Sequence, residues 1–209
     1  FKQKTAYEIP KRDWSSDVCS SDLYTELAKM IDHSLLHPTM TDRELEEGCA
    51  IAAKYNVASV CIKPYYVRRA VELLQGTNVR VGCVIGFPHG NSLTEVKRYE
   101  TELACRDGAV EIDMVVNIGK ALSGDWEDVE RDVRAVCDEA HKHGAIVKVI
   151  FENDFLPDNE VKIRLCQICE KCKAAWRTSS APGSRKYRFA KALESKYRLS
   201  GNLPLAQQE

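Results

Sequence analysis

The sequence predicts an α/β fold in which helices cover a parallel sheet. Short runs rich in apolar residues, such as residues 81–87 and 145–151, have the length of strands. A segment with helical periodicity follows almost every run of this kind. Strands that are apolar on both faces and alternate with helices are typical of parallel sheets, because both faces of such a sheet are buried.

The first elements follow this alternation. Residues 28–36 end in a short extended piece. Thr41 and Glu44 have the spacing of a capping box, which predicts a helix from there to about residue 55. The β-branched run 57–62 then predicts the next strand.

The middle of the chain repeats the same order. Pro64 predicts the start of a helix that runs to about residue 74, and a strand follows over residues 79–85. Ser92 and Glu95 form a second capping-box pattern. We expect the helix that they open to end near Gly108.

The last elements of the pattern are two strands and two helices. Strands are predicted over residues 110–116 and 145–151. Between them, residues 125–143 predict a helix that Gly144 ends. Residues 157–172 have the pattern of a further helix.

Two architectures contain such repeated units: a doubly wound open sheet and an eight-stranded (β/α) barrel. No G-x-G-x-x-G follows the first strand, and the sequence contains no P-loop motif. In a barrel the reactive residues lie at the C-terminal ends of the strands, where the unusual residues of this chain occur. We therefore predict the (β/α)8 barrel family, here as an incomplete barrel of about five to six βα units within residues 24–176.

Charge, hydropathy and cysteine content narrow the class of protein. Lys and Arg number 30 and Asp and Glu 31, so the net charge of −1 argues against nucleic acid as a partner, while a local phosphate site fits. No apolar run is long enough to span a membrane, and no signal-peptide pattern is present. The nine scattered cysteines predict reduced thiols and a soluble cytoplasmic protein.

Both ends of the chain differ from its central part. Residues 1–23 lack helical and strand periodicity and resemble the conceptual translation of a sequencing adapter, which predicts a non-native leader; a natural disordered leader is the alternative. Residues 177–209 are basic in their middle and contain no strand-like apolar run. We expect an out-of-frame or otherwise non-native tail.

Two charged residues lie inside predicted strands. Lys148 is in the middle of the strand 145–151, and Asp113 is in the middle of the strand 110–116. A buried lysine needs an anionic partner or its pKa falls, and such lysines serve as acid/base groups or Schiff-base amines. The pattern supports two interpretations equally: an acid/base pair in a barrel mouth, or a structural ion pair.

Three more residues are candidates for the site: Asp32 on the first extended piece, Cys61 at the end of the second strand, and Asn117 directly after the fourth. A metal site is not favoured, because the spacing of the five histidines matches no ligand motif. The C-x2-C-x2-C motif at residues 166–172 lacks both a nearby fourth ligand and a following proline. We therefore expect no metal site.

Five motifs in order carry a family resemblance: IDHSLL, VCIKP, VGCVIGFPHG, EIDMVVNIG and VKVIFE. Over about residues 27–175 the chain resembles deoxyribose-phosphate aldolase. The resemblance implies a cytoplasmic class I (Schiff-base) aldolase barrel that needs neither metal nor cofactor. It implies a small phosphorylated sugar as substrate, 2-deoxy-D-ribose 5-phosphate, cleaved reversibly to acetaldehyde and D-glyceraldehyde 3-phosphate in deoxyribonucleotide catabolism. It implies no nucleic-acid or membrane partner, and it is compatible with a homo-oligomer.

The resemblance also implies a role for each candidate residue. Asp113 would be the proton donor and acceptor, and Lys148 would be the active-site lysine beside the Schiff-base lysine. Asp32, Cys61 and Asn117 would line the substrate site.

One departure from the family pattern concerns the reaction itself. The family's Schiff-base lysine lies in a V-K-T-S-T-G motif, whereas here Arg177 precedes T-S-S. Arginine stays protonated and does not form the imine, so we predict that this chain is inactive. A truncation or frame shift near Trp176 accounts for this change together with the missing seventh-strand lysine motif and phosphate loop. Two alternatives stay open: a non-enzymatic misfolded fragment, or a different phosphate-handling barrel enzyme with Lys148 as nucleophile.

Overall fold

A single parallel sheet organises the part of the chain that the computed structural model describes, residues 19–156 and 158–178. Its six strands are paired in the order of the sequence, and all five pairings are parallel. The strands are β1 (Asp32–Leu35), β2 (Ser59–Ile62), β3 (Arg80–Ile85), β4 (Glu111–Val115), β5 (Ile146–Ile150) and β6 (Trp176–Thr178).

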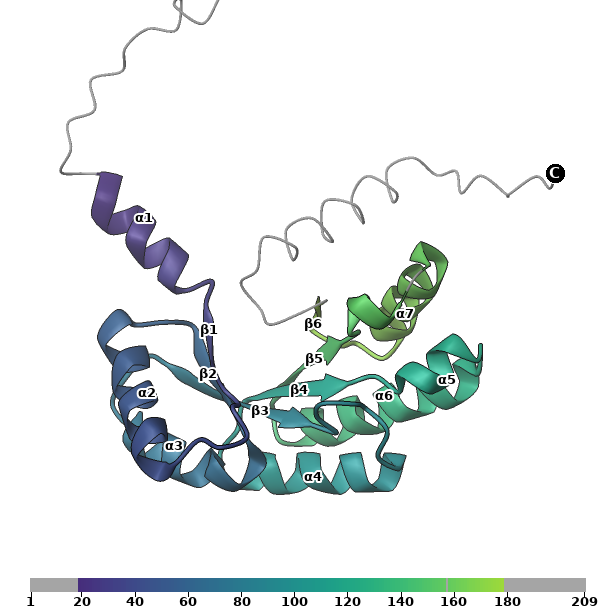
Figure 1. Cartoon of the computed structure of the whole chain (residues 1–209), viewed down its shortest axis with the longest axis horizontal. Coiled ribbons are helices and arrows are strands. Elements are labelled where there is room, and N and C mark those ends of the chain that lie inside the picture. The colour runs from purple at the N-terminus through teal and green to yellow at the C-terminus, as the bar shows by residue number, and fades with distance from the viewer. Residues whose placement is uncertain (1–18, 157, 179–209) are drawn as a thin grey trace, which may run out of the picture.

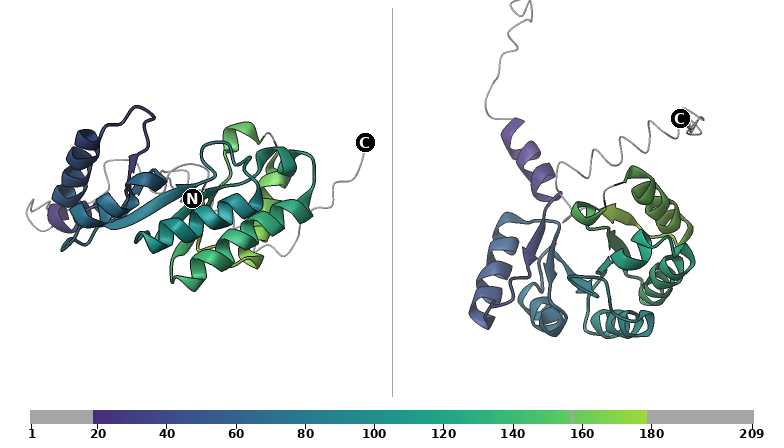
Figure 2. Two further views of the ribbon diagram at one scale, coloured as in Figure 1. Left: turned by 90° about the horizontal axis from the view of Figure 1, so that it is seen from below. Right: turned by 45° about the vertical axis from the view of Figure 1, so that its right-hand side comes forward.

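Helices connect the strands and cover the outer side of the sheet. They are α1 (Cys19–Ala28), α2 (Asp42–Tyr55), α3 (Val67–Leu73), α4 (Thr94–Arg106), α5 (Ile118–Leu122), α6 (Trp126–Lys142) and α7 (Asn159–Lys171), with 3-10 turns η2 (Pro64–Tyr66) and η3 (Asn153–Phe155). The strands form an arc with α2, α3, α4, α6 and α7 around its outside, while α1 extends away from it (Figures 1 and 2).

The strand order decides between the two predicted architectures. In a doubly wound sheet the strand order reverses at a switch point, whereas each strand here pairs with the next one in sequence. Sequential parallel pairing in a curved sheet is the arrangement of a (β/α) barrel. The prediction of an incomplete barrel with five to six βα units is therefore confirmed, with β1 and β6 at the edges of the described sheet.

The hydrophobic core lies between the outer face of the sheet and the helices. Alternate strand residues such as Val60, Ile112 and Val147 are fully buried there. Helix α6 presents an apolar stripe to them at helical spacing, and all of its members have no exposed surface: Val129, Val133, Val136, Cys137 and Ala140. Burial of these side chains fixes the face that each strand turns inward, and with it the residues that face the site.

Several predicted ends of elements are confirmed by local hydrogen bonds. The Thr41 side chain accepts from the backbone of Glu44, and the Glu44 carboxylate accepts from the Thr41 backbone at 2.7 Å, so the capping box of α2 is present. Asp125 caps α6, and Gly144 follows its end with a φ of 72°. A positive φ costs glycine little, which explains the residue at this stop.

Three expectations about local structure are wrong. Helix α4 begins at Thr94 after Leu93, with no side-chain cap, so Ser92 and Glu95 do not form the predicted capping box. Helix α5 was not expected, because its five residues are too few for a periodic pattern. Helix α1 begins at Cys19, inside the segment 1–23 that shows no periodicity. The rest of the predicted leader, residues 1–18, and residues 179–209 of the predicted tail lie outside the described residues.

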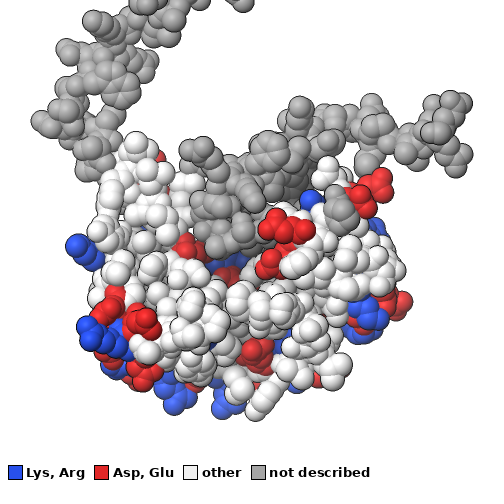
Figure 3. All heavy atoms as spheres, in the orientation of Figure 1, with Lys and Arg blue, Asp and Glu red and all other residues white. Residues whose placement is uncertain are grey.

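The charges on the surface are mixed in sign. Basic and acidic side chains lie interspersed over the face drawn in Figure 3, as the net charge of −1 leads one to expect. Among the described helices, none has the length and apolar character needed to cross a bilayer.

Candidate active site

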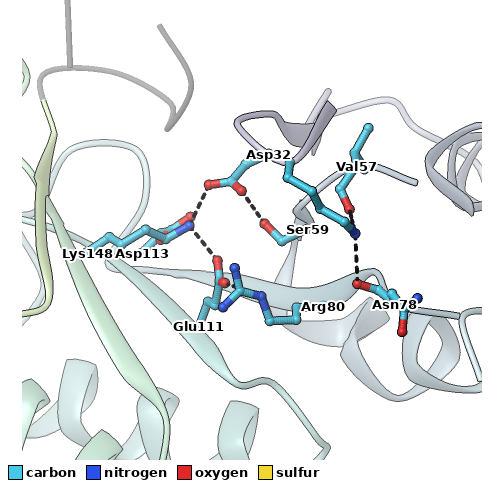
Figure 4. Close-up of polar contacts among 9 residues, drawn as sticks. Asp32, Val57, Ser59, Asn78, Arg80, Glu111, Asp113 and Lys148 are labelled. Atoms are coloured by element: carbon cyan, nitrogen blue, oxygen red, sulfur yellow. Dashed lines mark hydrogen bonds and ion pairs between the residues drawn. The ribbon is translucent and has the colours of Figure 1, made fainter. Parts of the chain in front are cut away.

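One lysine and three carboxylates meet on the inner face of the sheet (Figure 4). The Nζ atom of Lys148 on β5 lies 2.8 Å from Oδ2 of Asp32 on β1. The same atom lies 2.9 Å from Oε2 of Glu111 and 3.0 Å from Oδ1 of Asp113, both on β4. All four side chains are buried, with at most 6% of any side chain exposed.

Strand register explains why these residues face the same way. Asp113 pairs with Lys148 in the β4–β5 register, so the two side chains leave the sheet on the same side. Glu111 lies two residues before Asp113, and alternation along a strand places it on that side as well. Asp32 lies 116 residues before Lys148 and three strands away from β4, so the contact depends on the curvature of the sheet.

A second layer of hydrogen bonds fixes two of the carboxylates. The thiol of Cys61 on β2 donates to Oδ2 of Asp113 at 3.0 Å, and the Ser59 hydroxyl donates to Oδ1 of Asp32 at 2.5 Å. The first of these bonds spans β3, where Gly82 contributes no side chain between β2 and β4. The small residue therefore lets groups on non-adjacent strands meet.

The electrostatics of the cluster keep Lys148 charged. Burial by itself lowers the pKa of Lys148, but Asp113, Glu111 and Asp32 outweigh it and raise that pKa above the ordinary value. Burial also raises the pKa of Asp113, and the neighbouring Lys148 and Cys61 only partly offset this effect. Burial and the Asp113 carboxylate raise the pKa of the Cys61 thiol well above its usual range. At neutral pH the lysine is an ammonium and the thiol is protonated.

The arrangement is suited to moving protons. A buried carboxyl group with a raised pKa lies beside a fixed ammonium, and such a pair both accepts and donates protons. The ammonium has no lone pair, so Lys148 in this state is not a nucleophile.

The other two predicted site residues, Asn117 and Arg177, lie after β4 and in β6. Asn117 follows β4 and caps α5, where its Oδ1 accepts from the backbone of Lys120 at 3.2 Å. Arg177 lies in β6, and the register pairs it with Val149 on β5. Lys148 is paired with Trp176 in the same register, so Arg177 lies one residue beyond the position that faces the lysine.

Sequence reasoning missed two members of the cluster, Glu111 and Ser59. Each lies two residues before a residue that was selected, Asp113 and Cys61 respectively. Strand alternation places residues i and i+2 on one face, and this signal could have found both.

The structure offers no obvious metal centre in its described part. No group of three or more His, Cys, Asp or Glu residues there is placed to hold a metal ion, and the three carboxylates around Lys148 face its ammonium. Cys166 and Cys169 of the C-x2-C-x2-C motif lie on α7, and Cys172 directly follows that helix.

Comparison with known proteins identifies the family. The model of the DeoC/LacD family aldolases matches residues 26–160, which contain the whole cluster around Lys148. This chain belongs to the DeoC/LacD aldolase family. The family's barrel accounts for the sequential parallel strands, and the inner face of β1, β4 and β5 is where this aldolase-family chain holds its buried charges.

Individual relatives agree with this assignment. The deoxyribose-phosphate aldolases of Rhodopirellula baltica and Aciduliprofundum boonei are 48% and 44% identical to 77% and 76% of this aldolase-family chain. A crystal structure of a putative deoxyribose-phosphate aldolase from Coccidioides immitis superposes with a TM-score of 0.71 and 38% identity over 74% of the chain. The chain spans 67% and 72% of the two curated relatives and 60% of the crystallised one.

Proposed function

We propose that this chain carries the proton-transfer part of a deoxyribose-phosphate aldolase site. The observation that carries the proposal is the set of contacts from Lys148 Nζ to Asp113, Asp32 and Glu111 on the inner face of an aldolase-family sheet. The substrate class is a small phosphorylated sugar, 2-deoxy-D-ribose 5-phosphate. The reaction is its reversible cleavage to acetaldehyde and D-glyceraldehyde 3-phosphate.

The cluster fits one half of that chemistry. Schiff-base cleavage needs a neutral amine that attacks the carbonyl and a second group that moves protons to and from the reacting carbons and oxygens. Asp113 is the proton carrier in this proposal, because burial raises the pKa of its carboxyl group. Lys148 stays an ammonium, and it stabilises negative charge that develops on the substrate oxygen. Asp32, Cys61 and Asn117 line the substrate site.

We further propose that the chain as given lacks the attacking amine. Arg177 occupies the strand in which the family's V-K-T-S-T-G motif provides its lysine, and a guanidinium stays protonated. The three carboxylates disfavour Lys148 as a substitute, because they stabilise its charged form. The chain is therefore expected to have no aldolase activity of its own.

Borohydride reduction in the presence of acetaldehyde tests the proposal. We expect no trapped adduct on the chain by mass spectrometry and no cleavage of 2-deoxyribose 5-phosphate. A chimera that continues after Ala175 with the C-terminal part of the Rhodopirellula baltica relative is expected to show both, and Asp113→Asn in that chimera should abolish cleavage. Turnover in the unmodified chain that Lys148→Ala removes would support a different barrel enzyme with Lys148 as nucleophile.

A homo-oligomer also fits the structure. Helix α4 and its cap expose an apolar stripe of Leu93, Val96, Tyr99 and Leu103, with 42–72% of each residue accessible. The structure of the relative from Aeropyrum pernix is described as tetrameric. We propose that a second copy of this chain covers the stripe. Sedimentation velocity should show an oligomer that Val96→Lys dissociates, and a monomeric parent chain would contradict the proposal.

The thiols support a cytoplasmic location. Cys49, Cys61, Cys83 and Cys137 are buried and unpaired, which suits a reducing compartment. Alkylation of the denatured protein without prior reduction should modify these four residues, and their resistance to the reagent would contradict a reducing location.

A further inference from the structure

Glu111 connects the buried cluster to the start of β3. Its Oε2 accepts a hydrogen bond from Lys148 Nζ at 2.9 Å, and its Oε1 lies 3.0 Å from Nε of Arg80. Only 3% of the Glu111 side chain is exposed, whereas 55% of the Arg80 side chain is exposed. Figure 4 shows Glu111 between the two cations. The buried carboxylate is therefore held from both sides, once by the site and once by a cation that reaches solvent.

The hydrogen bonds of Lys148 are unevenly shared among its neighbours. The ammonium donates to Oδ2 of Asp32 and to Oε2 of Glu111. Oδ1 of Asp113 lies 3.0 Å away but has no hydrogen-bond partner in the described structure, although the atom is buried. The other oxygen of Asp113 accepts from Cys61. Oδ1 of Asp113 is therefore held by its ion pair with Lys148 and by no well-aligned hydrogen bond.

The charge balance of the cluster also indicates that Asp113 is the group that carries a proton. Lys148 and Arg80 supply two positive charges, and Asp32, Glu111 and Asp113 supply three carboxyl groups. Burying an unbalanced charge is costly, so the cluster is most stable when one carboxyl group keeps a proton. Asp32 and Glu111 accept well-aligned hydrogen bonds from Lys148, whereas Asp113 contacts it as an ion pair, and burial raises the pKa of Asp113.

We infer that Glu111 is a positioning residue: anchored by Arg80, it orients the Lys148 ammonium toward itself and Asp32, so that Asp113 meets the ammonium only as an ion pair and its Oδ1 can take and release a proton. The inference rests on the proposed function only in calling Asp113 the proton carrier. What the inference predicts is the charge state of Lys148 and Asp113, and this can be measured in the full chain without an activity assay. A failure of the aldolase proposal therefore leaves this measurement unaffected.

NMR titration of the full chain tests the inference, with labelled lysine and aspartate side chains assigned through Lys148→Arg and Asp113→Asn. The Lys148 ammonium of the parent chain should stay protonated up to the highest pH at which the chain is folded, and in Glu111→Gln its midpoint should fall toward the ordinary range of lysine, because one of its carboxylate partners is lost. The midpoint of Asp113 should fall as well, because Lys148 then donates to it. Glu102→Gln, which removes a carboxylate paired with Arg98 and Arg106 on α4, should shift neither. Unchanged midpoints in a folded Glu111→Gln would overturn the inference.

A second variant tests the anchor itself and does not disturb the buried side chain. Removing a cation by Arg80→Gln raises the midpoint of Asp113 if only charge matters, because one stabilising positive charge is gone. The midpoint of Asp113 falls instead if Arg80 fixes Glu111, because the released carboxylate moves away and Lys148 then donates to Asp113. We expect the fall, and a rise would overturn the anchoring role. Arg80 is half exposed, so this variant is expected to fold even where Glu111→Gln does not.

Discussion

Lys148 and Asp113 are paired residues on neighbouring strands, and Nζ of the lysine lies 3.0 Å from Oδ1 of the aspartate. A structural ion pair needs only one carboxylate for one ammonium, yet Asp32 and Glu111 contact the same nitrogen. The excess of buried carboxylates is costly for folding. We interpret this cost as the consequence of a site that keeps a titratable carboxyl group beside a fixed positive charge.

Removing the lysine should strongly destabilise the fold. Lys148→Met leaves three buried carboxylates without their common cation, and breaking a buried pair costs about 3–5 kcal/mol. Urea unfolding at pH 7 measures this loss. Lys171→Met is the matched control, because Lys171 is 64% exposed and solvent screens its pair with Glu130, so its loss should be much smaller. Similar losses in the two variants would show that the cluster around Lys148 is not buried.

The stability should also depend on pH through Asp113. Its pKa is raised in the folded state, so the folded chain binds this proton more tightly than the unfolded chain does. The free energy of unfolding therefore falls as the pH rises from about 4, the ordinary value for aspartate, through the raised value. Asp113→Asn lacks this fall, and its stability relative to the parent chain should increase over that range and then level off. A constant difference between the two unfolding curves across pH 3–8 would contradict the assignment.

A second buried ion pair joins α4 to α6, away from the site. Lys97 is fully buried, and its Nζ lies 2.5 Å from Oδ2 of Asp132 and 3.0 Å from the carbonyl oxygen of Val115. Asp132→Asn should cost about 3–5 kcal/mol in urea unfolding, because the ammonium stays buried without a counter-charge. Glu47→Gln, in an exposed pair with Arg43, should cost far less, because solvent screens that pair.

The double variant Lys97→Met with Asp132→Leu shows whether the ion pair as a whole raises or lowers the free energy of unfolding. Because it removes both charges together, it should recover most of the loss seen in Asp132→Asn. A double variant as unstable as Asp132→Asn would show that the hydrogen bond to Val115 matters more than the charges.

Residues 1–23 should contribute little to stability. The described side chains of α1 at Leu23, Tyr24 and Leu27 are 49–56% exposed, and the helix extends away from the sheet (Figure 1). Deletion of residues 1–23 is therefore expected to leave the thermal midpoint unchanged within error, and a drop of several degrees would show that the segment packs.

Substitution of Lys29, the residue directly after α1, should lower stability, in contrast to deletion of residues 1–23. Its Nζ donates to Asn56, to the carbonyl oxygen of Val57 and to that of Asn78. Lys29→Ala should cost about 1 kcal/mol. For a chain of this length, that loss lowers the thermal midpoint by roughly 2–4 °C. A midpoint equal to that of the parent would show that hydrogen bonds to water replace these three bonds without loss of stability.

The sequence by itself determined the α/β pattern and most ends of its elements. Apolar periodicity and caps such as Thr41 with Glu44 act over a few residues, so they are visible without the fold. The same local logic marked Lys148 and Asp113, because a charged residue in an apolar strand needs a partner. It failed at Ser92, where the spacing of a capping box is present but the chain starts its helix at Thr94.

Only the tertiary structure decided which charges meet. The contact between Asp32 and Lys148 joins residues 116 positions apart, and it exists because a sequentially paired parallel sheet curves. Glu111 and Arg80 enter the cluster through strand register, which depends on which faces of the strands the helices bury. The sequence shows which charged residues lie in the strands, whereas the distances between their side chains follow from the curvature and register of the whole sheet.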